Sequence, residues 1–100
     1  MLTHLVFFRF KDAEGRSADE NAAHAKAMLE ALPAQIPELQ SLSCGHDVSR
    51  TPASFDLGLS TTFVDAEALE IYRVHPAHQE VIAFIKATTS DRAVVDYLSD

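Results

Sequence analysis

Residues 2–10 constrain the fold more than any other part of the chain, because this predicted strand carries large apolar groups on both sides. Valine and phenylalanine favour strands, and the segment contains four of them within five positions. Side chains of a strand alternate between its faces, which puts His4, Val6, Phe8 and Phe10 on one face and Leu5, Phe7 and Arg9 on the other. We therefore expect a central strand that is covered on both sides.

The rest of the chain alternates helical and extended patterns. Ser17-Ala18-Asp19-Glu20 is a capping box, and it predicts a helix to about Leu32, where Pro33 ends it. Two strands are predicted next, at residues 39–48, with a bulge at Gly45, and at residues 55–64.

The last third of the chain predicts one interrupted helix and a final strand. Asp65 is suited to cap a helix, which His75-Pro76 interrupts before a second helical segment runs to about Lys86. Residues 93–98 form the last predicted strand.

The order β-α-β-β-α-β predicts an α+β fold, a ferredoxin-like plait, in one domain covering residues 1–100. Both helices would lie on one face of a four-stranded antiparallel sheet. The other face would then expose Leu5 and Phe7, which are large apolar groups. We expect a homodimer in which two sheets pack face to face and bury these residues.

Composition excludes several classes of protein. Apolar residues make up 47% of the chain, which is typical of a folded domain, and the net charge of −7 disfavours binding to nucleic acid or to an anionic membrane. No apolar run approaches the length of a membrane span, and the N-terminus lacks the basic region of a signal peptide. The single cysteine, Cys44, cannot form an internal disulfide. These features predict a cytoplasmic protein.

The segment Tyr72-Arg73-Val74-His75-Pro76-Ala77-His78 contains the most chemical information. Helical spacing directs Tyr72 and His78 to the same, apolar side, where buried polar groups need partners. Asp96 shares a strand face with Val94 and Leu98, and a His78–Asp96 hydrogen bond would fix the histidine tautomer and raise its basicity. Such a set is suited to general acid/base catalysis, although a His–Asp pair in a small domain is more often only a structural tie between helix and strand.

Other reactive residues have simpler interpretations. His75 and His78 have a spacing that can serve a metal, but Pro76 lies between them and no third ligand is evident, so we expect no metal site. Cys44 is interpreted as a packed thiol, and His24 and His46 as solvated or capping residues. The glycines form no phosphate-binding loop and nothing calls for heme, so no cofactor is expected.

Several segments together resemble the stress-responsive A/B barrel (Dabb) family over nearly the whole chain. The most specific part is Tyr-x-x-His-Pro-x-His at residues 72–78 followed by Val95-Asp96-Tyr97; the weaker matches are at residues 4–11 and 45–47, at Phe55-Asp56 and at Phe63. The resemblance implies a dimeric α+β barrel made of two plaits, with a cavity between helices and sheet in each subunit.

The resemblance also implies roles for residues. In a plant polyketide cyclase of this family, which needs no metal or organic cofactor, the catalytic tyrosine and histidine fall on Tyr72 and His78, and the supporting aspartate falls on Asp96. By that mechanism His78 removes a proton next to a carbonyl, Tyr72 donates to the developing oxyanion, and an aldol ring closure follows. The substrate-binding wall would consist of His4, Val6, Phe8, Leu57 and Leu59. This chain departs from the plant enzyme at Leu57, where that enzyme has a histidine, and at Ala27, where it has a tyrosine.

Two functions remain open from the sequence. The first is binding of a small apolar carbonyl or aromatic compound with cofactor-independent, polyketide cyclase- or isomerase-like chemistry. The second is a non-enzymatic binding or stress-protective module in which Tyr72, His78 and Asp96 only join helix to strand.

Overall fold

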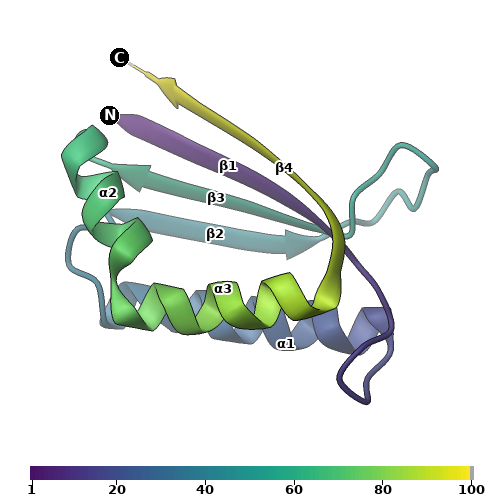
Figure 1. The fold of residues 1–100 in the computed structure, drawn as a ribbon. Helices are drawn as coiled ribbons and strands as arrows, with labels where there is room; N and C mark the ends of the chain where they lie inside the picture. Colours follow the sequence, from purple (N-terminus) through teal and green to yellow (C-terminus); the bar gives the residue numbers. More distant parts are fainter. Residues whose placement is uncertain (100) are drawn as a thin grey trace.

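The fold is a four-stranded antiparallel sheet with its helices on one face, in a computed structural model that describes residues 1–99 (Figure 1). The strands lie in the order β2-β3-β1-β4. The elements are β1 (Leu2–Phe10), α1 (Ala18–Glu30), a short 3-10 helix (Leu32–Ala34), β2 (Ser41–His46), β3 (Leu57–Phe63), α2 (Ala66–Val74), α3 (Pro76–Thr88) and β4 (Thr89–Leu98). The predicted α+β, ferredoxin-like plait is confirmed, with the second helical region divided into α2 and α3.

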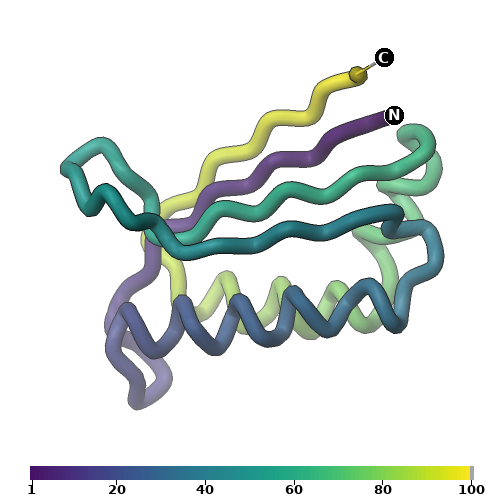
Figure 2. The backbone as a smooth tube through the Cα atoms, turned by 180° about the vertical axis from the view of Figure 1, so that it is seen from behind, coloured from purple at the N-terminus to yellow at the C-terminus, as the bar shows by residue number. Residues whose placement is uncertain are grey.

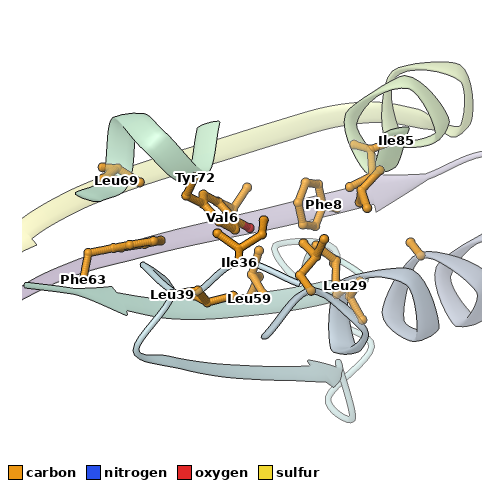
Figure 3. Packing of buried hydrophobic residues seen from close by; sticks show 14 of the residues in the cluster. Val6, Phe8, Leu29, Ile36, Leu39, Leu59, Phe63, Leu69, Tyr72 and Ile85 are labelled. Atoms are coloured by element: carbon orange, nitrogen blue, oxygen red, sulfur yellow. The ribbon is translucent and has the colours of Figure 1, made fainter. Parts of the chain in front are cut away.

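β1 is a central strand, as predicted, and it pairs with β3 on one side and β4 on the other. Its helix-facing side chains Val6 and Phe8 are buried in the core, together with Leu59 of β3 and Leu29 of α1 (Figure 3). On the opposite face Phe7 keeps 37% of its surface exposed within one chain.

Local signals set the helix boundaries. The capping box forms as predicted, because the Glu20 amide donates to Ser17 Oγ at 3.1 Å and the Ser17 amide donates to Glu20 Oε1 at 2.9 Å. α1 ends at Glu30, two residues earlier than predicted, and Leu32 to Ala34 continue as a 3-10 turn that contains Pro33. Asp65 caps α2 by accepting from the Ala68 amide at 2.9 Å.

The strands differ from the prediction in three places. β4 begins at Thr89 rather than at residue 93, because Thr89 is already extended and pairs with Phe10 immediately after α3. Its first residues are polar because they lie on an exposed edge of the sheet. β2 and β3 are shorter than predicted. The predicted bulge at Gly45 was wrong: Gly45 pairs regularly with Gly58, and the irregularity lies between Arg9 and Phe10.

The start of β1 and the end of β4 lie at the end of the sheet where α2 is found, as Figure 2 also shows from behind. The Ser99 amide donates to the Met1 carbonyl oxygen at 2.9 Å and joins the two ends of the chain. Within residues 1–99, no helix has the length and apolar character needed to cross a membrane.

Candidate functional site

A cleft of about 350 Å³ lies between α2, α3 and the helix-facing side of β1 and β4. It opens at this edge because β4 is the last strand of the sheet, and Val94 and Asp96 on its helix-facing side remain exposed. The polar lining includes His4, Tyr72, His78 and Asp96, and Val6, Phe8, Leu59 and Ile82 contribute apolar surface. The volume is in the range of small-molecule sites.

Tyr72 lies on α2 and has no exposed surface. Its ring packs against Phe63, with 5.0 Å between ring centroids, and against His78, with 4.2 Å. Tyr72 is one of the residues that line the cleft, and its hydroxyl is buried with no hydrogen-bond partner among residues 1–99. Burial, with a smaller effect from Cys44, raises the pKa of the Tyr72 hydroxyl well above its usual value, so this group is a hydrogen-bond donor at neutral pH.

The break between α2 and α3 determines how His78 is held. In a continuous helix the Arg73 carbonyl would accept from the amide of residue 77, but the Ala77 amide donates to His75 Nδ1 at 3.0 Å instead. The Arg73 carbonyl oxygen is thereby available to accept from His78 Nδ1 at 3.1 Å and from Gln79 Nε2 at 2.6 Å. Because Nδ1 carries the proton in this bond, the lone pair of neutral His78 is on Nε2.

His78 is 8% exposed, and burial lowers its pKa; the bond to the Arg73 carbonyl acts in the opposite direction without cancelling this effect. The imidazole is therefore neutral at pH 7 and can accept a proton at Nε2. The expectation that Asp96 raises the basicity of His78 was wrong, because desolvation dominates at this position.

Asp96 is paired with His4, not with His78 as predicted. Asp96 Oδ1 accepts a hydrogen bond from His4 Nδ1. The cause is strand register: His4 and Asp96 are directly opposite each other in the β1–β4 ladder, where side chains of facing residues are close enough to interact. A sequence signal existed, since antiparallel pairing of Leu2 with Leu98 also pairs His4 with Asp96.

Four of the five predicted wall residues line the cleft, namely His4, Val6, Phe8 and Leu59. Leu57 does not line it, and this part of the prediction was wrong. Leu57 is 1% exposed and pairs with Phe8 at the start of β3, whereas Leu59 pairs with Val6 farther along the strand.

Three cationic residues of the cleft, Arg73, Lys86 and Arg92, were missed by sequence reasoning. For Lys86 a signal was present, because it follows His78 and Ile82 at helical spacing of four. Arg92 could be found only through the register, which pairs it with Phe8. Arg73 forms an ion pair with Glu70 at 2.8 Å on the surface of α2.

The other reactive residues lie outside the cleft or have structural partners. Burial raises the pKa of Cys44 to about 11, so its thiol is protonated at neutral pH, and the nearby Glu30 carboxylate adds to this effect. His24 stacks on Phe84 with 4.6 Å between ring centroids. His46 is the last residue of β2, and His75 caps α3. Residues 1–99 contain no group of three or more side chains arranged to hold a metal ion.

Known proteins share both sequence and fold with this chain. An uncharacterized protein of Streptomyces coelicolor is 36% identical over 83 residues, which cover 83% of this chain and 84% of that protein. A solved dimeric ferredoxin-like protein of unknown function from Jannaschia is 30% identical, with a TM-score of 0.78 and 98% of each chain covered. The hydroxynitrile lyase of Passiflora edulis has a TM-score of 0.83 over 99% of this chain and 93% of its own; at 17% identity it shows the shared fold alone.

A family model also matches the chain over nearly its full length. The model is described as the stress-responsive A/B barrel domain, Dabb, and it matches residues 2–99. This range includes every strand and helix of the fold and all residues of the cleft. The chain therefore belongs to the stress-responsive A/B barrel (Dabb) domain family.

Proposed function

We propose that the cleft binds a small, largely apolar carbonyl compound and catalyses cofactor-independent acid/base chemistry on it, of the cyclase or isomerase type. The observation that carries this proposal is the Tyr72 hydroxyl, which is buried at the cleft without a partner among residues 1–99, beside His78. A buried hydroxyl without a partner costs about 1–3 kcal/mol, and a ligand carbonyl oxygen would supply the missing acceptor.

The chemistry follows from the two side chains. The substrate carbonyl oxygen accepts a hydrogen bond from Tyr72, and His78 Nε2 takes a proton from the adjacent carbon. The electron pair of that C–H bond moves into the carbon–carbon bond of an enolate, whose oxygen Tyr72 stabilises. In a β,γ-unsaturated ketone the enolate extends into a dienolate, and return of the proton from His78 to the γ-carbon moves the double bond and gives the conjugated isomer. Attack of the enolate carbon on a second carbonyl of the same molecule closes a ring, and the proton from His78 neutralises the new alkoxide.

Asp96 has a different role from the one predicted, because its partner is His4. In this proposal Asp96 is a positioning residue that holds the His4 imidazole at the cleft, where both residues form part of the lining. His4, Val6, Phe8 and Leu59 remain the proposed substrate-binding wall.

The test is proton exchange, which needs no knowledge of the natural substrate. The protein is incubated with 4-phenyl-2-butanone in D2O, and loss of the α-proton signals is followed by NMR. We expect exchange above the buffer rate, with His78→Gln reducing it about 100-fold. His46→Gln is the matched control, since His46 lies outside the cleft. Equal rates for the wild type and His78→Gln would overturn the catalytic proposal.

The binding or protective module is the second candidate, and the complete burial of Tyr72 favours it. The ring fills space between Phe63 and His78, so both residues contribute to packing whether or not they react. Under this function, 4-phenyl-2-butanone would shift the His78 ring resonances on binding, and no exchange above the buffer rate would occur.

We also propose that the chain forms a homodimer through the open face of the sheet. Leu5 and Phe7 of β1 lie on this face beside Val95 and Tyr97 of β4, which are 52% and 46% exposed. Contiguous exposed apolar groups of this kind are typical of interfaces. The description of the Jannaschia structure as dimeric supports the proposal.

Light scattering tests the dimer. Phe7→Asp should give a monomer or an aggregate, because the carboxylate would be buried at the interface. Val48→Asp, at an exposed position outside the sheet, should remain dimeric. A well-folded wild-type monomer at micromolar concentration would contradict the proposal.

A further inference from the structure

The cleft has two chemically different ends. Facing pairs of β1 and β4 follow one another along it: His4 with Asp96, Val6 with Val94, and Phe8 with Arg92. On α3 the lining residues His78, Ile82 and Lys86 recur at a spacing of four, which puts them on one side of the helix. Each wall therefore runs from a histidine-containing end through an apolar middle to a cationic end.

The two cationic ends coincide because α3 leads directly into β4. α3 ends at Thr88 and β4 begins at Thr89, so the strand returns antiparallel to the helix, as Figure 1 shows. Lys86 and Arg92 are near this reversal, and His78 and Asp96 are far from it. The separation between His78 and Lys86 is about 12 Å along the helix. The separation between Arg92 and Asp96 is about 13 Å along the strand.

Lys86 and Arg92 have no ion-pair partner among residues 1–99. By contrast, Arg73 at the same cleft is paired with Glu70, and Arg9 on the open face is paired with Asp91. In a chain with a net charge of −7, two uncompensated cations at one end of an apolar cleft form a local positive potential. Such a site attracts an anionic group.

We propose that Lys86 and Arg92 bind a carboxylate of the ligand, so that the cleft accepts an elongated, apolar keto acid. Its acid end lies between these two cations, its hydrocarbon part contacts Val6, Val94 and Ile82, and its carbonyl faces Tyr72 and His78. The carbonyl end of this arrangement rests on the proposed function, whereas the carboxylate end rests on the charges and their register alone.

The test compares two probes that differ only in charge at one end, 9-oxodecanoate and 9-oxodecanamide. Dissociation constants are measured by NMR titration of the full chain at low salt. We expect the acid to bind about fivefold more tightly than the amide for each cation engaged. Lys86→Gln/Arg92→Gln should abolish this preference, so that acid and amide bind with equal affinity.

The control is Lys11→Gln/Arg16→Gln, which removes the same two charges from exposed positions outside the cleft. It should preserve the preference for the acid. The inference would be overturned if the wild type bound acid and amide with equal affinity or bound neither of them. It would also be overturned if both double variants lost the preference for the acid to the same extent. The proposed function fails separately, if His78→Gln leaves proton exchange of the bound amide's methyl ketone unchanged.

Discussion

Two polar pairs, His4–Asp96 and Tyr72–His78, line the same cleft and differ in how far their hydrogen-bonding groups are satisfied. His4 and Asp96 face each other across two strands and bond directly. Tyr72 and His78 stack ring against ring, His78 bonds a backbone carbonyl, and the Tyr72 hydroxyl has no partner among residues 1–99. The His4–Asp96 hydrogen bond fixes the positions of these two side chains on neighbouring strands. The Tyr72 hydroxyl has no acceptor within the described part of the chain and lies beside the neutral imidazole of His78, so it is available to hydrogen-bond a ligand.

Tyr72→Phe should have the largest effect on this contrast. Removing the hydroxyl should reduce proton exchange about 100-fold, because the developing oxyanion loses its donor. The fold should be retained and become more stable by about 1–3 kcal/mol, because a buried polar group without a partner is removed. Exchange measured by NMR together with thermal unfolding checks both effects. Unchanged exchange would remove Tyr72 from the reaction.

Asp96→Ala should have a smaller effect. Proton exchange should fall less than about tenfold, and stability by less than about 1 kcal/mol, because the Asp96 side chain is 42% exposed. The His4 ring resonances should shift and those of His78 should remain in place. Asp91→Ala on the same strand is the control, since Asp91 pairs with Arg9 on the other face. Movement of His78 equal to that of His4 would contradict the observed pairing.

The smallest expected effect is the pH dependence of stability that arises from His78. Burial lowers the pKa of His78 in the folded state below its ordinary value of 6.5, so the unfolded chain binds more protons in the interval between the two values. This contribution is fully present above about pH 6.5, and it is lost as the pH falls through the folded-state pKa. Unfolding curves of wild type and His78→Gln should therefore differ in their slope against pH below this value. Identical slopes would contradict the burial of His78.

Local signals in the sequence predicted most of the architecture. The alternation of Val6 and Phe8 against Leu5 and Phe7 predicted the central strand, and Ser17 with Glu20 predicted the start of α1. His75-Pro76 predicted the helix break. These features depend on residues close in the chain, whose geometry follows from backbone sterics and capping. The start of β4 at Thr89 was missed because polar residues on an exposed edge strand carry no apolar alternation.

The site was predicted less completely. The sequence predicted that Tyr72 and His78 lie on one side of the helical region, and in the structure their rings pack against each other. It also suggested a partner for Asp96, but the histidine chosen was His78 rather than His4. Both histidines point into the space between the sheet and the helices, where they line the cleft. The alternation of side chains along a strand therefore does not show which of the two histidines meets Asp96. Leu57 was assigned to the wall because it shares a strand face with Leu59, but of these two residues only Leu59 lines the cleft.

The sequence by itself determined the order of elements, the face on which each strand residue lies, and the helix break, because each depends on local steric and hydrogen-bonding preferences. Only the tertiary structure decided which residues meet. Strand register joined His4 to Asp96, and the direct passage from α3 to β4 brought Lys86 and Arg92 to one end of the cleft. Burial lowered the pKa of His78. These outcomes depend on the free energy of packing and desolvation, which is a property of the assembled layers rather than of any short segment.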